Sequence, residues 1–405
     1  MPTTSRREVL KGALAAGGAL LAPRLTLAAS PSDARFVLIL LRGGLDGLSA
    51  VPPYADPDYA RLRRELALPA PGTDGGALDL DGFFGLHPSL TFLHEAFADG
   101  ELAVLHAVAT PYRDRSHFDA QNVLESGFTT PHAGDSGWLN RALGALPAAR
   151  AAAPAAERAV ALGQNVPLVL RGPAQVTSWS PSRLPAPDDD TLRRIADLYA
   201  EDPLLSRRLD DALAARAQAS ASMDDRAAGG RRGDARLGET VAAAAGFLGD
   251  DGHASVAVLD TTGWDTHANE GAAQGQLALR LASLDAALRE LKRGLGPSWR
   301  RTVVLVATEF GRTAEANGSR GTDHGTGAAA FLLGGAVQGG RVVADWPGLA
   351  ARALHEGRDL APTLDLRSVL KGVLAEHLGV PEHALDADVF PDSRAAPLLT
   401  GLVRA

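Results

Sequence analysis

The sequence predicts an α/β fold with a mostly parallel central sheet, because short apolar runs alternate with helical patterns along the chain. Apolar runs that are bounded by turn residues are typical of buried strands, and they occur at 36–41, 103–108, 159–162, 255–259, 302–307 and 328–333. A helix is predicted after Gln274 and before Gly294 and Pro297. Its apolar face consists of Leu277, Leu281, Leu284, Leu288 and Leu291.

The region from about 188 to 245 departs from this alternation. It is rich in Ala, Arg and Asp, it has helical patterning, and it contains no strand candidate. We therefore expect a helical insertion over the sheet, within a single α/β domain that covers residues 30–405.

Residues 1–29 have the features of a twin-arginine signal peptide. Arg6 and Arg7 precede an apolar run at 12–22, and the small residues Ala28 and Ala29 suit a signal peptidase. The run is shorter than the roughly 20 residues that span a bilayer, and no later segment is long and apolar enough to do so. We expect export through the twin-arginine translocase to the periplasm or the medium, with no membrane span in the mature chain.

The amino-acid composition limits which partners and which metal ligands are expected for the chain. The formal net charge is −8, and removal of the predicted signal peptide makes the chain more acidic, which argues against nucleic acid as a partner. The chain has no cysteine, so disulfides and thiolate ligands are excluded. Any metal must be held by His, Asp and Glu.

Polar residues gather where the predicted strands end. Ligands bind beyond the carboxyl ends of the strands in open α/β sheets, so these residues are expected to form one cluster. They are Asp46 after the first strand, Ser116 after the second, Asp265 and His267 after the fourth, Glu309 and Arg312 after the fifth, and Asp323 and His324 before the sixth.

These residue types suit a divalent cation. Asp265 and His267 stand two apart, so on an extended segment they share a face, and the glycines around Asp323 and His324 allow both side chains to turn toward an ion. Carboxylate and imidazole groups ligate hard or borderline metals. Ser116 is expected to begin a helix, whose N-terminus would favour an anion.

Structural roles are open for each of these residues. Asp46 suits an Asx-turn, Ser116 suits a plain N-cap, and Glu309 and Arg312 suit an internal ion pair. His117 suits a position packed under the helix that it begins, and we do not count it among the expected ligands.

Several motifs resemble an exported family known as domain-of-unknown-function family 1501. The resemblance extends over essentially the whole mature chain, and the last three internal motifs are the most specific. The matching segments are 41–48, 116–118, 137–139, 264–267, 308–313, 321–325 and 389–391.

That family is similar in turn to the alkaline phosphatase and sulfatase superfamily. The resemblance implies an alkaline-phosphatase-like α/β/α sandwich, with Asp265, His267 and His324 at a first metal and Asp46 serving a second. Phe310 stands where phosphatases have a histidine for the second metal. One site is therefore favoured over two, with zinc or manganese as the ion and with Glu309 and Asp323 completing or neighbouring the site.

The resemblance implies metal-dependent hydrolysis of a small phosphate or sulfate ester by an exported protein. Ser116 would attack the ester, and Arg312 or Arg42 would hold its anionic group. The alternative is a catalytically inactive binding or accessory protein of the same fold.

Overall fold

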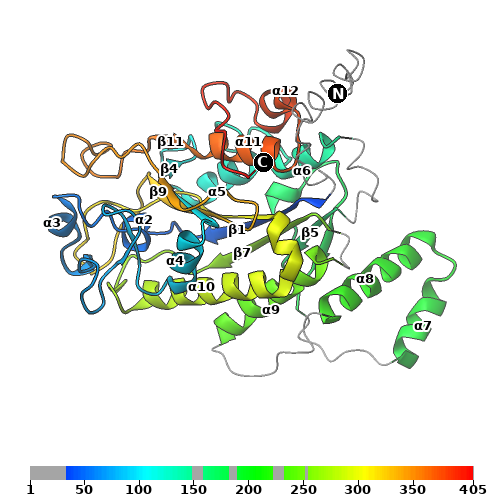
Figure 1. Cartoon of the computed structure of the whole chain (residues 1–405). Helices are drawn as coiled ribbons and strands as arrows, with labels where there is room; N and C mark the ends of the chain where they lie inside the picture. Colours follow the sequence, from blue (N-terminus) through cyan, green and yellow to red (C-terminus); the bar gives the residue numbers. More distant parts are fainter. Residues whose placement is uncertain (1–32, 148–157, 182–188, 222–231, 251–253, 405) are drawn as a thin grey trace, which may run out of the picture. The chain divides into compact units, whose positions relative to one another are not determined.

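The computed structural model describes residues 33–147, 158–181, 189–221, 232–250 and 254–404. The predicted signal peptide lies outside the described residues. Apart from a two-stranded hairpin, β2 (Leu78–Asp79) with β3 (Gly85–Leu86), the strands form one sheet that runs through the middle of the protein (Figure 1).

The described part of this sheet has nine strands, in the order β10-β4-β9-β8-β1-β7-β5-β6, with β11 beside β4. The strands are β1 (Arg35–Arg42), β4 (Leu102–Ala109), β5 (Ala159–Leu162), β6 (Thr177–Trp179), β7 (Val256–Thr262), β8 (Thr302–Thr308), β9 (Ala328–Leu333), β10 (Arg341–Val343) and β11 (Leu364–Asp365). All six predicted strands are present, and the predicted mostly parallel sheet is confirmed. In the middle, β1 pairs in parallel with both β7 and β8.

The direction of β9 differs from the prediction. It runs antiparallel to both β8 and β4. The segment that joins β8 to β9 contains no helix, so the chain returns beside β8 without the crossover that a parallel neighbour requires. A buried apolar run looks the same in either direction, which is why the sequence did not predict the reversal.

Helices cover both faces of the sheet (Figure 1). Alternate residues of β1 point to opposite sides, so Val37 and Ile39 pack against one helical layer and Phe36 and Leu38 against the other. The first layer contains α4 (Thr91–Ala98), α9 (Arg232–Leu248) and α10 (Gln276–Leu295), and the second contains α5 (His117–Ser126), α6 (Trp138–Gly144) and α11 (Leu366–Glu376). The result is an α/β/α sandwich.

The long predicted helix is α10, and all five of its predicted apolar-face leucines are buried. The region 188–245 is helical where the structure describes it, with α7 (Asp189–Tyr199), α8 (Pro203–Ala221) and most of α9. However, α9 is a layer of the sandwich, because Val241, Ala244 and Leu248 are buried in the core with α10. Only α7 and α8 fit the description of an insertion.

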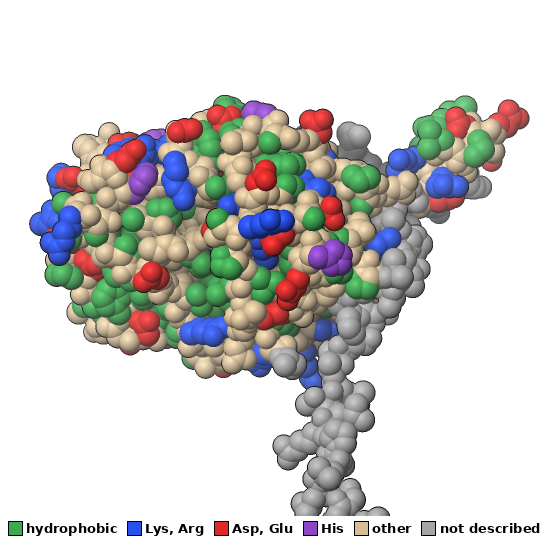
Figure 2. Space-filling view, turned by 90° about the horizontal axis from the view of Figure 1, so that it is seen from above, with side chains coloured by type: hydrophobic (Ala, Val, Ile, Leu, Met, Phe, Trp, Pro, Cys, Tyr) green, Lys and Arg blue, Asp and Glu red, His purple; other side chains and the backbone are tan. Residues whose placement is uncertain are grey.

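Surface charge is mixed on the face shown in Figure 2, where acidic and basic side chains lie singly or in small groups among polar and apolar ones. In the described part of the chain, no helix combines the length and the apolar character that a membrane crossing needs.

Candidate metal centre

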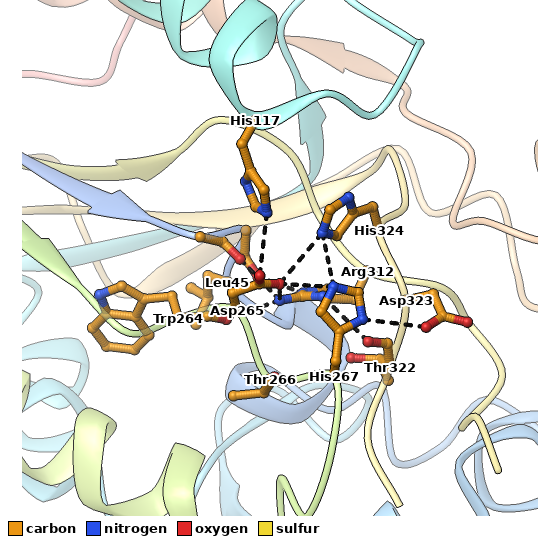
Figure 3. A network of polar contacts seen from close by, with 12 residues as sticks. Leu45, His117, Trp264, Asp265, Thr266, His267, Arg312, Thr322, Asp323 and His324 are labelled. Carbon is orange, nitrogen blue, oxygen red and sulfur yellow. Dashed lines mark hydrogen bonds and ion pairs between the residues drawn. The ribbon is translucent and has the colours of Figure 1, made fainter. Parts of the chain in front are cut away.

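Four side chains meet at the carboxyl edge of the sheet, and they come from three separate parts of the chain (Figure 3). Asp265 and His267 lie in the loop after β7, His324 lies in the loop before β9, and His117 is the first residue of α5. The isolated bridge between Arg312 and His324 ties the loop after β8 to the loop before β9. Rigid elements thus deliver all four side chains.

The Nε2 atoms of the three histidines face the Asp265 carboxylate. His267 Nε2 lies 3.0 Å and His324 Nε2 lies 3.3 Å from Oδ1, and His117 Nε2 lies 3.5 Å from Oδ2. The Nε2 atoms of His267 and His324 are 2.9 Å apart. This cluster of His117, Asp265, His267 and His324 is called the histidine cluster below.

The other nitrogen of each ring faces an oxygen. His117 Nδ1 lies 2.9 Å from Glu309 Oε1, His267 Nδ1 lies 3.3 Å from Asp323 Oδ1, and His324 Nδ1 lies 3.0 Å from the Arg115 carbonyl oxygen. A carbonyl oxygen only accepts, so His324 carries its proton on Nδ1. The Glu309 carboxylate favours the same tautomer of His117, whereas both nitrogens of His267 face a carboxylate, Asp323 at Nδ1 and Asp265 at Nε2.

Three Nε2 atoms and a carboxylate thus point at one another. His117 Nε2 is buried and makes no hydrogen bond with the described residues, and Asp265 Oδ2 lies 3.5 Å from it. His117, Asp265 and His324 each offer a ligand atom within 4.8 Å of the others. A divalent cation would satisfy such a donor set. In metal-bound histidines, the ring nitrogen that does not bind the metal usually donates to an oxygen, as the Nδ1 positions here allow. The residues therefore fit a metal ion.

The electrostatics favour cation binding at Asp265 and His324 and oppose it at His117. Burial opposes ionisation of Asp265, but Arg312 outweighs this effect and lowers the pKa of the carboxyl group. Burial also lowers the pKa of His324, which favours its neutral form. The hydrogen bond to Glu309 raises the pKa of His117. Phe310 packs against two of the rings, with centroids 4.8 Å from that of His117 and 5.0 Å from that of His324.

The predicted ligands fall into three groups. Asp265, His267 and His324 converge as expected from the sequence. Glu309 and Asp323 contact the cluster through the Nδ1 atoms of His117 and His267. Glu309 also accepts hydrogen bonds from the Gly43 amide and the Gln121 side chain, so it orients a ring rather than facing the cluster centre.

Asp46 lies elsewhere, in a buried ion network. Its carboxylate accepts from the Ser49 amide at the start of α2 (Gly47–Ala50) and from Arg63 Nη2 at 2.6 Å. Arg63 Nη2 also lies 3.6 Å from Glu270 Oε1, and all three charged side chains are buried. Burial and the Asp46 carboxylate raise the pKa of Glu270 to about 8. Asp46 is therefore the N-cap of α2 and the ion-pair partner of Arg63, which agrees with the structural role that the sequence left open.

The two predicted catalytic residues, Arg312 and Ser116, have surroundings that differ from those expected of catalytic groups. Arg312 is buried, and its nitrogens donate to Asp265 and to the carbonyl oxygens of Gly43, Gly44, Trp264 and Thr322. It clamps the loops of the site and has no face for an anion. Ser116 is the N-cap residue of α5, although its side chain makes no capping hydrogen bond.

Arg42 lies at the edge of a cavity of about 300 Å³ beyond β1, β5 and β7. It pairs with Asp260 and, at 2.8 Å, with Glu125, and it donates to Gln121. Gln121 in turn donates to Glu309, so a chain of hydrogen bonds joins the cavity to the histidine cluster.

Sequence reasoning missed His117 as a cluster member. Its signal was its place directly after Ser116, in a strand-end loop like those of the other candidates. The competing expectation was that the ring would pack under its helix. The ring does contact Phe310, but its Nε2 atom still faces Asp265.

The protein is therefore an α/β/α sandwich with a histidine–aspartate cluster at the carboxyl edge of its sheet. The family model described as protein of unknown function (DUF1501) matches residues 33–389, and the chain belongs to this family. The family predicted from the motifs is thereby confirmed. No curated protein matches the chain.

Two solved structures are distantly similar. The crystal structure of Ps i-CgsB in complex with k-i-k-neocarrahexaose has a TM-score of 0.41 and 9% identity, over 87% of this chain and 74% of that chain. The structure of BT1596, a 2-O GAG sulfatase, has a TM-score of 0.32 and 11% identity, over 77% of this chain and 66% of that chain. Both TM-scores are low, so neither likeness bears on the chemistry of the site.

Proposed function

We propose that the chain binds one divalent metal ion, zinc or manganese, through His117, Asp265, His267 and His324. The observation that carries this proposal is the set of three Nε2 atoms that face one carboxylate while every Nδ1 atom faces an oxygen. One ion is proposed rather than two, because Arg63 already neutralises Asp46.

The proposed activity is hydrolysis of a small phosphate or sulfate ester. A divalent ion in such a site polarises the ester oxygen and lowers the pKa of a bound water. The side chains of Asp265 and His267 are 42% and 45% exposed, which supports access for a substrate. The first amides of α5 lack the Ser116 cap and suit anionic oxygens, and the cavity beside Arg42 suits the organic part of the ester.

A binding or accessory protein without catalysis is the second candidate. It is favoured by one observation, the burial of Arg312 with its nitrogens donating to protein oxygens. This residue cannot hold an anionic group, and a hydrolase would have to rely on the ion, the α5 amides and Arg42.

The test combines metal analysis with turnover. The full chain is purified, its metal content is measured, and hydrolysis of p-nitrophenyl phosphate and p-nitrophenyl sulfate is assayed with and without added zinc or manganese. The proposal expects one ion per chain and metal-dependent release of p-nitrophenol that is lost in His324→Ala. One ion without turnover supports the second candidate, and a chain that binds no ion refutes the metal site.

Export through the twin-arginine pathway belongs to the same proposal. Its support is the pair Arg6 and Arg7 before an apolar run. The Arg6→Lys, Arg7→Lys variant should remain in the cytoplasm while the parent chain is recovered outside it. Equal recovery of both outside the cytoplasm would refute this route.

A further inference from the structure

The buried Glu270 carboxylate lies at a junction that the histidine cluster does not include. It is in the loop between β7 and α10, and its side chain is fully buried. Three hydroxyl groups donate to it: Ser49 Oγ to Oε1 at 2.8 Å, and Thr266 Oγ1 and Thr322 Oγ1 to Oε2 at 2.9 and 3.1 Å. Arg63 Nη2 lies 3.6 Å from Oε1.

Two of these three hydroxyls belong to the loops that carry the cluster. Thr266 stands between Asp265 and His267, and Thr322 stands two residues before His324. Figure 3 draws both threonines on the side of the cluster away from His117. The same loops are joined by backbone hydrogen bonds, from the Thr322 amide to the Thr266 carbonyl at 3.2 Å and from the Asn269 amide to the Ser319 carbonyl at 3.0 Å.

We propose that Glu270 is a positioning residue for the metal site, because one of its oxygens fastens both ligand loops at a fixed separation. This inference rests on the proposed metal binding. Oε2 accepts from both threonines, so a side chain without an acceptor oxygen at this position removes both contacts at once. Since the threonines are next to or near the ligands in sequence, a loosened Oε2 contact changes the separation of His267 and His324.

The variants separate positioning from general packing. Glu270→Met keeps about the size of the side chain but removes both acceptor oxygens, and Thr322→Val removes one hydroxyl from a ligand loop. Ser49→Ala is the matched control, because it removes a hydroxyl from the same carboxylate on α2, which carries no ligand. Zinc affinity of the full chain is measured by competition with a chelator of known affinity.

Glu270→Met and Thr322→Val should each raise the dissociation constant for zinc about tenfold to a hundredfold, as outer-shell changes do. Ser49→Ala should stay within about threefold of the parent, the scatter expected of an outer-shell contact that bears on no ligand loop. Unchanged zinc affinity in both loop variants would overturn the proposal. So would an equal loss in Ser49→Ala, which would indicate a general packing effect.

A second measurement does not depend on metal. In chelated protein, amide hydrogen exchange at Asn269 and Thr322 reports whether the loops remain fastened. Glu270→Met and Thr322→Val should speed exchange at these amides at least tenfold, and Ser49→Ala should not. If the parent binds no zinc, the metal proposal fails while faster exchange still supports loop positioning by Glu270. Unchanged exchange would refute the positioning role itself.

Discussion

The histidine cluster and the Asp46–Arg63–Glu270 network lie at the same edge of the sheet but solve the problem of negative charge differently. The network is buried and contains its own cation, since Arg63 contacts both carboxylates. In the cluster, Arg312 neutralises Asp265, but three imidazole Nε2 atoms face the same carboxylate and His117 Nε2 makes no hydrogen bond with the described residues. This difference is why an added ion is proposed for the cluster and not for the network.

The largest expected effect comes from removing the internal cation. Arg63→Leu leaves the Asp46 carboxylate buried without a counter-charge, and breaking such a buried pair costs about 3–5 kcal/mol of unfolding free energy. Denaturant unfolding would measure the loss. Arg61→Leu, which breaks an exposed pair with Asp58, should change stability by less than about 0.5 kcal/mol. Similar values for the two variants would erase the contrast between the regions.

Zinc should stabilise the folded chain only by binding to the histidine cluster. Zinc at a hundredfold excess over its dissociation constant should add about 2.7 kcal/mol to the unfolding free energy of the parent chain. The variant with both His267→Ala and His324→Ala should show no such gain, and a chelator should lower the melting temperature of the parent alone. His383→Ala, in an exposed position, is the control. A zinc response that survives the double substitution would place the ion elsewhere.

Stability at acid pH should depend on His106, a buried histidine that belongs to neither the histidine cluster nor the Asp46–Arg63–Glu270 network. Burial lowers the pKa of His106 to about 4, and its Nε2 atom donates to the Val51 carbonyl while Nδ1 accepts from the Ala107 amide. The folded pKa lies below the unfolded value of about 6.5, so stability is present above pH 6.5 and is lost as pH falls toward 4. The loss should be on the order of 2 kcal/mol at pH 5.

The measurement is the unfolding free energy against pH for the parent and His106→Gln. Between pH 6.5 and 4 the variant should show a shallower slope, by up to one proton or about 1.4 kcal/mol per pH unit. Parallel curves would mean that His106 does not contribute to acid unfolding.

The smallest expected effect concerns the support of a ligand. Asp323→Asn removes the carboxylate from His267 Nδ1 while leaving an amide oxygen within reach. Since the Asp323 side chain is 51% exposed, the expected loss of zinc affinity is at the lower end of the outer-shell range, about tenfold. Asp99→Asn, an exposed change at the end of α4, is the control. No change in zinc affinity would show that His267 needs no orienting partner.

The sequence predicted the sandwich well, because its strands and the α10 face are marked by simple periodicities. It predicted the convergence of Asp265, His267 and His324 for a related reason, since strand-end loops in a parallel sheet share an edge. Residue type could not separate Asp46 from these ligands. Its burial with Arg63 depends on how α3 (Tyr59–Arg63) packs, and no local pattern encodes that.

The sequence could not predict the roles of Arg312 and Glu309 for a similar reason. An arginine after a strand can hold an anion or clamp loops, and only the carbonyl oxygens around Arg312 decide between the two. Glu309 was expected at or beside the metal, and its actual contact is with the far side of the His117 ring. Which nitrogen of a ring faces a carboxylate is set by tertiary packing, beyond the reach of spacing along the chain.

The place of β1 has a consequence for synthesis of the chain. It is the first strand made, yet its partners are β7 and β8, which are separated from it by more than half of the sequence. Until the chain has passed Thr308, the apolar run 36–41 of β1 lacks its complete β8 partner, and before Val256 is made it lacks both partners. Such long-range pairing folds slowly and leaves aggregation-prone intermediates. A ribosome-stalled chain that ends before β8 should therefore be protease-sensitive throughout, and protection should arise as a single late step.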